Sequence, residues 1–407
     1  MHRNLSAAKS AKQDEFYTQY VDIQKEVEAY LEYTPDTFRG KAVYCNCDDP
    51  FESNFFKYFA ANFNKLGLKK LVTTSYDGSP IAGAQLPFGE YDEGNGKRPK
   101  PKAIAVEIEE VKDVTGDGAI GIEDVTLFLK QNPHTRKPLA GGGDFRSAEC
   151  VELLTQADIV VTNPPFSLFR EYVAQLVEHG KKFLIIGNVQ AITYKEIFPL
   201  IKADKMWMGV TIHSGDREFR VPDHYPLNAA GSRVDENGVK YIRVKGVRWY
   251  TNLDHGSRHE ELKLMSMADN LRYNKKLNGD AYHQYDNYGA IEVPFTDAIP
   301  SDYDGVMGVP ITFLDKYNPE QFEILGATQR GCHDLVPDTR KYDDYWEVRQ
   351  DGSETGSSGG KTNENANLLG NDGRKNYFIN SEGRIIQSAY QRIFIRHRAR
   401  PARRTTK

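Results

Sequence analysis

A short apolar run followed by two prolines constrains the fold of this chain more than any other stretch. Residues 158–162, Asp-Ile-Val-Val-Thr, predict a buried strand of a parallel sheet because they are mostly β-branched and apolar. Residues 163–166, Asn-Pro-Pro-Phe, follow directly, and Ser167 is expected to cap a helix of apolar residues at helical spacing. The order strand, turn, helix predicts an open α/β sheet, and such sheets bind ligands at the carboxyl ends of their strands.

The turn after this strand offers two hydrogen-bond acceptors beside a flat ring. Two successive prolines, Pro164 and Pro165, remove backbone donors and hold the turn extended, so the carbonyl oxygen of Pro164 has no partner in a sheet. Asn163 adds a side-chain carbonyl, and Phe166 adds an aromatic face. This combination fits the exocyclic amino group of a planar base. A proline turn capped by asparagine is the structural alternative.

Residues 158–172 resemble the catalytic motif of amino-group DNA methyltransferases, and more narrowly that of the EcoRI-type adenine-specific family. Further stretches resemble the same family: 14–18, 183–188, 191–200 and 246–252. The resemblance is collinear from about residue 4 to about residue 330 and returns at 392–397. It implies a Rossmann-like class I methyltransferase fold, with a doubly wound, mostly parallel sheet and an antiparallel edge hairpin. A C-terminal α+β target-recognition region would follow.

The resemblance also implies S-adenosyl-L-methionine as the cofactor. The segment 16–18 would close over the methionine part, the loop after the first strand would wrap its amino-acid portion, and later acids would hold the ribose and adenine. The implied residues are Phe16, Tyr17, Thr18, Asp49, Pro50, Asp77, Asp144 and Phe145. The loop 48–55 lacks the glycines usual in methyltransferases, which leaves its cofactor contacts undefined. The structural alternatives are a core-facing helix start, turns and helix N-caps.

Alternating elements predict the order of the sheet, and a composition shift predicts the domain boundary. Expected helices are 14–33, 51–66 and 147–156; expected strands are 41–45, 70–75, 103–107 and 182–187; residues 206–251 are β-rich. Residues 1–265 are expected to form the catalytic domain and 266–407 the DNA target-recognition region. Within the latter, 351–375 is rich in Gly, Ser, Asn and Asp, which predicts a long mobile loop.

The net charge of −4 is unusual for a protein that binds nucleic acid, so a local basic surface must carry that function. Arg392, Arg396 and Arg398 lie in an acid-free C-terminal stretch that alternates with apolar residues. This pattern predicts a strand that presents arginines to DNA. A solvated basic tail is the alternative.

Two groups of potential metal ligands do not predict a bound metal. Asp113, Asp117 and Asp124 stand at positions one, five and twelve of a calcium-loop pattern, but the third position is Thr115 and a strand precedes the loop. A turn that caps the next helix is favoured over a calcium site. Cys45 and Cys47 lie on and after a predicted strand without a second pair at zinc spacing, which favours small buried hydrophobic residues.

The expected function is transfer of a methyl group from S-adenosyl-L-methionine to the exocyclic amino group of adenine in duplex DNA, after the base leaves the stack. A methyltransferase acting on RNA or on protein glutamine, and a non-catalytic DNA-binding relative, remain as alternatives. The protein is expected to be cytoplasmic, since it has no membrane-spanning apolar run and no apolar signal core. A monomeric state is also expected. A companion restriction endonuclease fits such an enzyme, but no residue indicates one.

Overall fold

The computed structural model describes residues 18–50, 53–75, 77, 103–118, 120–132, 135–213, 215–221, 227, 231–277, 282–328, 332, 335–358, 363, 365–370, 373, 376–389 and 391–398. These residues form two compact units. The first contains Met1–Ala191 and Trp207–Gly256, and the second contains Ile192–Met206 and Ser257–Lys407. The short segment Ile192–Met206 therefore belongs with the C-terminal half of the chain, although strands of the first unit flank it in sequence.

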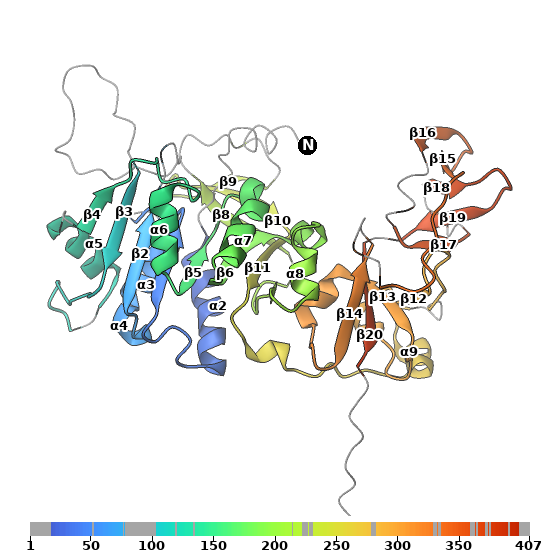
Figure 1. The fold of residues 1–407 in the computed structure, drawn as a ribbon, viewed down its shortest axis with the longest axis horizontal. Coiled ribbons are helices and arrows are strands. Elements are labelled where there is room, and N and C mark those ends of the chain that lie inside the picture. Colours follow the sequence, from blue (N-terminus) through green and yellow to red (C-terminus); the bar gives the residue numbers. More distant parts are fainter. Residues whose placement is uncertain are drawn as a thin grey trace, which may run out of the picture. The chain divides into compact units, whose positions relative to one another are not determined.

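The first unit is built on an eight-stranded sheet with the order β4-β3-β2-β1-β5-β6-β11-β7 (Figure 1). Its strands are β1 (Ala42–Asn46), β2 (Lys70–Thr74), β3 (Ile104–Ile108), β4 (Arg136–Pro138), β5 (Ile159–Thr162), β6 (Lys182–Asn188), β7 (Trp207–Met208) and β11 (Val247–Thr251). The four central strands β2, β1, β5 and β6 pair in parallel. This arrangement confirms the predicted doubly wound centre of the sheet.

Both flanks of this sheet are antiparallel, which the sequence only partly predicted. β3 runs antiparallel to β2, and β4 runs antiparallel to β3. A parallel neighbour needs a crossover, usually a helix, and the Gly- and Pro-rich stretch between β2 and β3 has no helical pattern. At the other flank β11 pairs antiparallel with β6 and β7. The predicted edge hairpin is thus divided, because β8 (Asp216–Val221), β10 (Lys240–Lys245) and β9 (Arg233–Val234) form a separate sheet.

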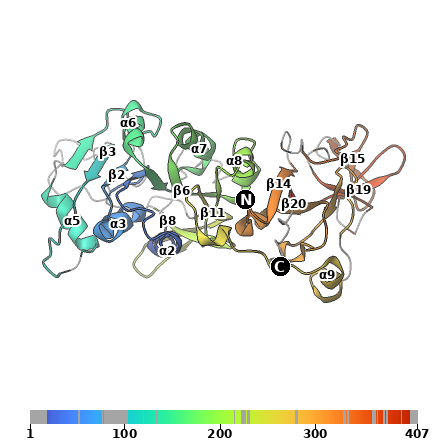
Figure 2. The same ribbon diagram turned by 60° about the horizontal axis from the view of Figure 1, so that its bottom comes forward.

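Helices cover both faces of the eight-stranded sheet, which explains why β1 and β5 are buried along their whole length. Figure 2 shows α6 (Ala148–Gln156) and α7 (Phe169–Glu178) on one face. On the other face lie α2 (Tyr20–Tyr33), α3 (Asn54–Ala61) and α5 (Ile122–Gln131), with the short α4 (Phe63–Leu66) after α3. The core on that face is aromatic, as in the edge contact between Phe55 and Trp249 at a ring-centroid distance of 5.9 Å.

Three predicted helix boundaries need correction. The helix expected at 14–33 begins only at Tyr20, because Thr18 and Gln19 are not helical. The helix expected at 51–66 is interrupted at Asn62 and ends, as predicted, at Gly67, whose φ of 62° suits glycine. Ser167 does not cap the helix after the proline turn. Pro165, with φ of −54°, starts a 3-10 turn at Phe166–Leu168, and α7 begins only at Phe169. The apolar face of α7 that was predicted from spacing is buried.

Among its described residues, the second unit contains two sheets and two short α-helices, besides 3-10 turns. One sheet has the order β12-β13-β20-β14, and the other, antiparallel, has the order β16-β15-β18-β19-β17 (Figure 1). The bounds are α8 (Phe198–Lys202), α9 (Met267–Tyr273), β12 (Ala290–Glu292), β13 (Val306–Pro310), β14 (Phe322–Ala327), β15 (Trp346–Arg349), β16 (Glu354–Ser358), β17 (Asn367–Leu369), β18 (Asn376–Ile379), β19 (Ile385–Ser388) and β20 (Arg392–His397). β16 and β17 lie within 351–375, so the long loop predicted there is interrupted by strands.

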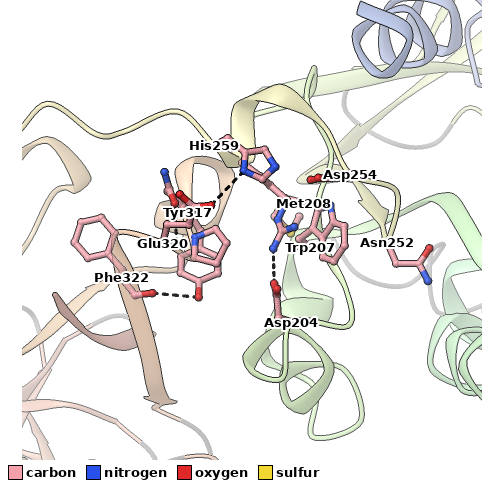
Figure 3. A network of polar contacts seen from close by, with 12 residues as sticks. Asp204, Trp207, Met208, Asn252, Asp254, His259, Tyr317, Glu320 and Phe322 are labelled. Carbon is pink, nitrogen blue, oxygen red and sulfur yellow. Dashed lines mark hydrogen bonds and ion pairs between the residues drawn. The ribbon is translucent and has the colours of Figure 1, made fainter. Parts of the chain in front are cut away.

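An ion pair attaches the segment Ile192–Met206 to the rest of the second unit. The buried guanidinium of Arg258 forms an ion pair with Asp204. Nearby, His259 lies 3.9 Å from Glu320, and the hydroxyl of Tyr317 donates to the carbonyl of Phe322 at 3.4 Å (Figure 3). The Arg258–Asp204 ion pair and the packing of α8 against β14 place this segment with the second unit rather than with the strands on either side of it in sequence.

Among the described residues, no helix combines the length and apolar character needed to cross a bilayer.

Candidate active site

The centre of the site is the carboxyl edge of β1 and β5. The chain leaves β1 toward β2 on one side and later forms β5 on the other, so a topological switch point lies between β1 and β5. Ligands of open α/β sheets bind at such a point. Buried polar side chains gather at or after these strand ends: Asn46, Asp48, Asp49, Ser53, Thr73, Thr74, Ser75, Thr162 and Asn163. Buried polar groups cost stability unless they are bonded, so this concentration marks a functional edge.

A hydrogen-bond network fixes three strand ends relative to one another. The Thr162 hydroxyl donates to the backbone carbonyl of Asn46, which joins β5 to β1. The Thr74 hydroxyl donates to Oδ1 of Asn46 at 3.0 Å, which joins β2 to β1. Tyr44 adds a hydroxyl contact to Thr74 at 3.0 Å. The loops that follow these strands therefore start from fixed positions.

Cys47 takes a backbone conformation in the first turn after β1 that usually requires glycine. Its φ is 64°, in the left-handed region that residues other than glycine rarely adopt. Cys45 is fully buried, as predicted, whereas Cys47 is only half-buried, so the prediction of a buried hydrophobic residue is wrong for Cys47. Its conformation turns the chain into the loop that contains Asp48 and Asp49.

Asp48 is a buried acid at the same loop that was not among the predicted site residues. Its Oδ1 accepts from the Ser53 hydroxyl at 2.6 Å, and the Ser53 oxygen accepts from the Phe55 amide at 3.1 Å, so one pair of side chains caps α3 and fixes the loop. Within the described residues, Oδ2 of Asp48 has no hydrogen-bond partner. Burial, with a smaller contribution from the neighbouring Asp49, raises the pKa of Asp48 to about 7. The sequence does place Asp48 shortly after a predicted buried strand, and this position could have indicated a site residue.

The N-terminal segment reaches the same loop. The Thr18 carbonyl accepts from Nδ2 of Asn54 at 2.7 Å, and the Thr18 side chain is buried with no hydrogen-bond partner for its hydroxyl among the residues described. Asp49 and Pro50 are also buried at this loop. Phe16 and Tyr17, predicted to contact the cofactor, lie outside the described residues.

Asp77 and the glycine turn 141–143 lie together although they are distant in sequence. The Asp77 amide donates to the Gly142 carbonyl at 2.8 Å, and an Asp77 carboxylate oxygen accepts from the Ala103 amide. Gly142 has φ of 67°, and a Cβ there would lie 3.5 Å from Oδ2 of Asp77. The exposed carboxylate of Asp77 is therefore held at the end of β2 with Oδ2 facing the turn.

Asp144 and Phe145 follow this turn, and Arg146 engages both. The Asp144 carboxylate accepts from Nε of Arg146 at 2.8 Å and from Nη2 at 2.6 Å, and Nη1 of Arg146 bonds Glu171 at 2.9 Å. The guanidinium carbon lies 5.1 Å from the centre of the Phe145 ring. Phe145 is buried, with its ring 5.0 Å from that of Tyr172. Ligand binding here would have to share Asp144 with Arg146.

The first three residues of the turn after β5 are buried. Asn163, Pro164 and Pro165 are buried, and Phe166 is half-buried against the core of the first unit. The amide of Leu168 donates to the Pro165 carbonyl at 2.9 Å. In contrast, the Pro164 carbonyl accepts no hydrogen bond from any residue that the structure describes. The predicted acceptor is therefore available at the carboxyl end of β5.

The acidic turn before α5 acts as a helix cap. Carboxylate oxygens of Asp113, Asp117 and Asp124 lie within 4.8 Å of one another. Asp124 nevertheless accepts from the amides of Val114, Thr115 and Gly121 at 2.8 Å each. These backbone hydrogen bonds, chiefly those from Thr115 and Gly121, lower the pKa of Asp124 to about 2. The structural alternative considered from the sequence, a capping turn, describes these contacts.

The predicted DNA-binding arginines have different environments. Arg392 is buried and donates through Nε to both carboxylate oxygens of Glu292, at 3.2 and 3.0 Å. Arg396 is exposed and bonds Glu323 at 2.8 Å, while Nε of the exposed Arg398 donates to the Pro319 carbonyl at 2.6 Å. Only Arg396 and Arg398 of the three therefore present charge at the surface.

Residues 4–398 match the family model described as Adenine-specific methyltransferase EcoRI. The matched range includes both units and the buried edge at β1 and β5. The chain belongs to this family. Among curated proteins, it is 46% identical over 327 residues to the Type II methyltransferase M.EcoRI of Escherichia coli, covering 79% of this chain and 88% of that protein. It is 39% identical over 324 residues to the Type II methyltransferase M.MpnI of Mycoplasma pneumoniae, covering 79% of this chain and 84% of that protein. No solved structure matches it.

Family membership decides among the functions that the sequence left open. The chain is a site-specific, adenine-specific DNA methyltransferase, with the class I methyltransferase fold and additional C-terminal sheets. Methylation of RNA or of protein glutamine, and a non-catalytic DNA-binding role, are not supported by the family match.

Proposed function

We propose that the carboxyl edge of β1 and β5 is the catalytic centre, where Asn163 and the Pro164 carbonyl hold the amino group of the target adenine. The observation that carries this proposal is the coincidence of two features at one switch point. The Pro164 carbonyl, without a partner among the described residues, follows β5, and the buried acids Asp48 and Asp49 follow β1. A hydrogen-bond acceptor for the base and the polar residues proposed to bind the cofactor thus follow adjacent strands.

The same edge fits S-adenosyl-L-methionine. When bound, this cofactor supplies a methyl group on a positively charged sulfur. Buried groups without partners in the described part of the chain, Oδ2 of Asp48 and the Thr18 hydroxyl, need hydrogen-bond donors and acceptors that a polar ligand provides. Asp77 offers a carboxylate for the two ribose hydroxyls. Asp144 and Phe145 are proposed to contact the adenine end, with Arg146 positioning Asp144.

The residues of the turn after β5 act mainly by positioning. An adenine amino group inside a duplex is out of reach, so the base must leave the stack. Asn163 and the Pro164 carbonyl would each accept one amino hydrogen, which directs the nitrogen lone pair toward the methyl group. Pro165 keeps this turn extended, and Phe166 is proposed to stack on the base. Fixed acceptors also stabilise the positive charge that develops on the nitrogen.

The second unit is proposed to hold duplex DNA. It contains Arg396 and Arg398, whose exposed guanidinium groups suit phosphate contacts. Arg392 is proposed instead to stabilise β20 through Glu292. We also propose that the boundary between the catalytic domain and the DNA-binding region lies near residue 265. The protein is proposed to be a monomer that acts on DNA in the cytoplasm. The DNA substrate supports the cellular location.

A split between binding and turnover tests these assignments. The variant Asn163→Ala should bind S-adenosyl-L-methionine almost normally by calorimetry but transfer methyl groups at least about a hundredfold more slowly, the scale for one lost aligned polar group. Asp77→Ala should weaken cofactor binding instead. The control Asn132→Ala removes an amide at the end of α5, outside the site, and should change neither quantity. Near wild-type turnover of Asn163→Ala would contradict the catalytic assignment.

A further inference from the structure

One buried carboxylate in the second unit gathers two arginines and a tyrosine. The Asp286 side chain is only 3% exposed. Its Oδ1 accepts from Nη2 of Arg340 at 3.0 Å and from Nη2 of Arg384, and its Oδ2 accepts from the Tyr342 hydroxyl at 2.6 Å. Both guanidinium groups therefore contact the same oxygen atom and lie side by side.

Backbone contacts hold each member of this cluster in place. The Asp286 amide donates to the Asn367 carbonyl at 2.7 Å, next to β17. The Arg340 amide donates to the Asn287 carbonyl at 3.0 Å. The Arg384 amide donates to Oδ1 of Asn380 at 2.7 Å in the turn between β18 and β19. The arginines are thus anchored at both the backbone and the tip of the side chain.

Each guanidinium nevertheless keeps an open edge. The side chains of Arg340 and Arg384 are 58% and 43% exposed, although their common acceptor is buried. Among described residues, only Nη2 of each guanidinium donates a hydrogen bond, which leaves Nε and Nη1 for a ligand. Two guanidinium groups thus share one buried carboxylate.

The chemistry of this pair favours base edges over phosphates. A guanidinium presents a planar fork that matches two adjacent acceptors, and guanine O6 and N7 are the commonest such pair in the major groove. Acids flank the cluster. Burial is the main cause that raises the pKa of Tyr345, and the nearby carboxylates of Asp286, Asp344 and Glu382 raise it further. Exposed acids repel a phosphate backbone but accept from base amino groups.

We propose that Arg340 and Arg384 read guanine in the recognition sequence of this methyltransferase, with Asp286 as the residue that positions both. This inference rests on the proposed role of the second unit as the DNA-binding part. It assigns the reading of the DNA sequence to the two arginines that share the buried carboxylate of Asp286. It also separates reading of bases, by Arg340 and Arg384, from phosphate contacts, by Arg396 and Arg398.

Lysine variants test the proposal because they keep the charge and lose the fork. Purified wild-type protein, Arg340→Lys and Arg384→Lys would each methylate genomic DNA, and single-molecule sequencing would give the methylated motif. Each variant should lose about tenfold to a hundredfold of its preference for guanine at one position, while the salt dependence of DNA binding stays constant. The matched control Arg272→Lys changes an exposed arginine of α9 outside the cluster and should keep the motif. Asp286→Asn should relax both positions.

Other outcomes overturn the proposal in recognisable ways. An unchanged motif in both lysine variants, with a lower thermal unfolding temperature, would make the cluster purely structural. Glutamine variants that flatten the salt slope by about one unit each without changing the motif would make the arginines phosphate contacts. Failure of the proposed DNA-binding role of the second unit has a different signature, because Arg396→Gln and Arg398→Gln would then also leave the salt slope unchanged.

Discussion

Ionisation of Asp48 should change the stability of the folded protein. Its carboxyl group is buried between the ends of β1 and β2, and the Thr73 hydroxyl donates to its backbone carbonyl. Burial raises its pKa to about 7, against about 4 in an unfolded chain. The folded state therefore holds a proton that the unfolded state releases. Between pH 4 and pH 7 the contribution of Asp48 to stability falls as pH rises, by about 1.4 kcal/mol for each unit of pKa shift.

The variant Asp48→Asn should remove this pH dependence. Asparagine keeps a side-chain oxygen for the Ser53 hydroxyl but carries no charge. We expect the variant to unfold at a higher urea concentration than wild type at pH 8, and the difference to shrink toward pH 4.5. Urea titrations across this range measure it. A difference that is the same at every pH would show that Asp48 is not the titrating group.

For single residues, the sequence predicted those positions that are decided by neighbouring residues in the chain. The turn 163–166 was placed at a strand end because strand, turn and helix follow one another. The environment of Arg392 could not be predicted, since Glu292 and Tyr285, which form its buried cluster, belong to a distant part of the chain. The role of Asp286 was missed for the same reason.

At the element scale, β20 shows how one strand can combine a buried and an exposed arginine. Arg392 pairs with Glu292 of β12 in the interior, while Arg396 pairs with Glu323 of β14 at the surface. Removing one partner of a buried pair leaves an uncompensated charge, which costs about 3–5 kcal/mol, whereas exposed pairs contribute about 0–1 kcal/mol.

The variants Arg392→Gln and Arg396→Gln form a matched pair for this comparison. We expect the first to lower the free energy of unfolding by several-fold more than the second, and to leave the salt dependence of DNA binding unchanged. Chemical unfolding of both proteins measures the difference. Equal losses of stability would mean that the Arg392–Glu292 pair does not hold β20 in place.

Element boundaries were predictable where local signals were strong. Gly67 ends its helix as expected, and the apolar spacing after residue 168 predicts the buried face of α7. The antiparallel direction of β3 and the strands within 351–375 were not predicted, because strand pairing is decided by partners elsewhere in the chain.

At the scale of the whole molecule, a protein of net charge −4 must concentrate its basic groups to bind DNA. Each phosphate contact contributes about 0.9 to the slope of log affinity against log salt on duplex DNA. Neutralising Arg396 and Arg398 together should therefore flatten that slope by roughly one to two units and leave cofactor affinity unchanged. Titrations at several salt concentrations, with cognate and scrambled duplexes, measure both effects. An unchanged slope would remove these arginines from the interface.

The site proposed at the carboxyl ends of β1 and β5 is expected to catalyse methylation of the amino group of adenine at one DNA sequence. Single-molecule sequencing of DNA from cells that express either wild type or Asn163→Ala tests it most directly. We expect N6-methyladenine at a single short motif with the wild-type protein, and loss of that modification with the variant. Modified cytosine in place of adenine, or a motif that remains fully methylated by Asn163→Ala, would contradict it.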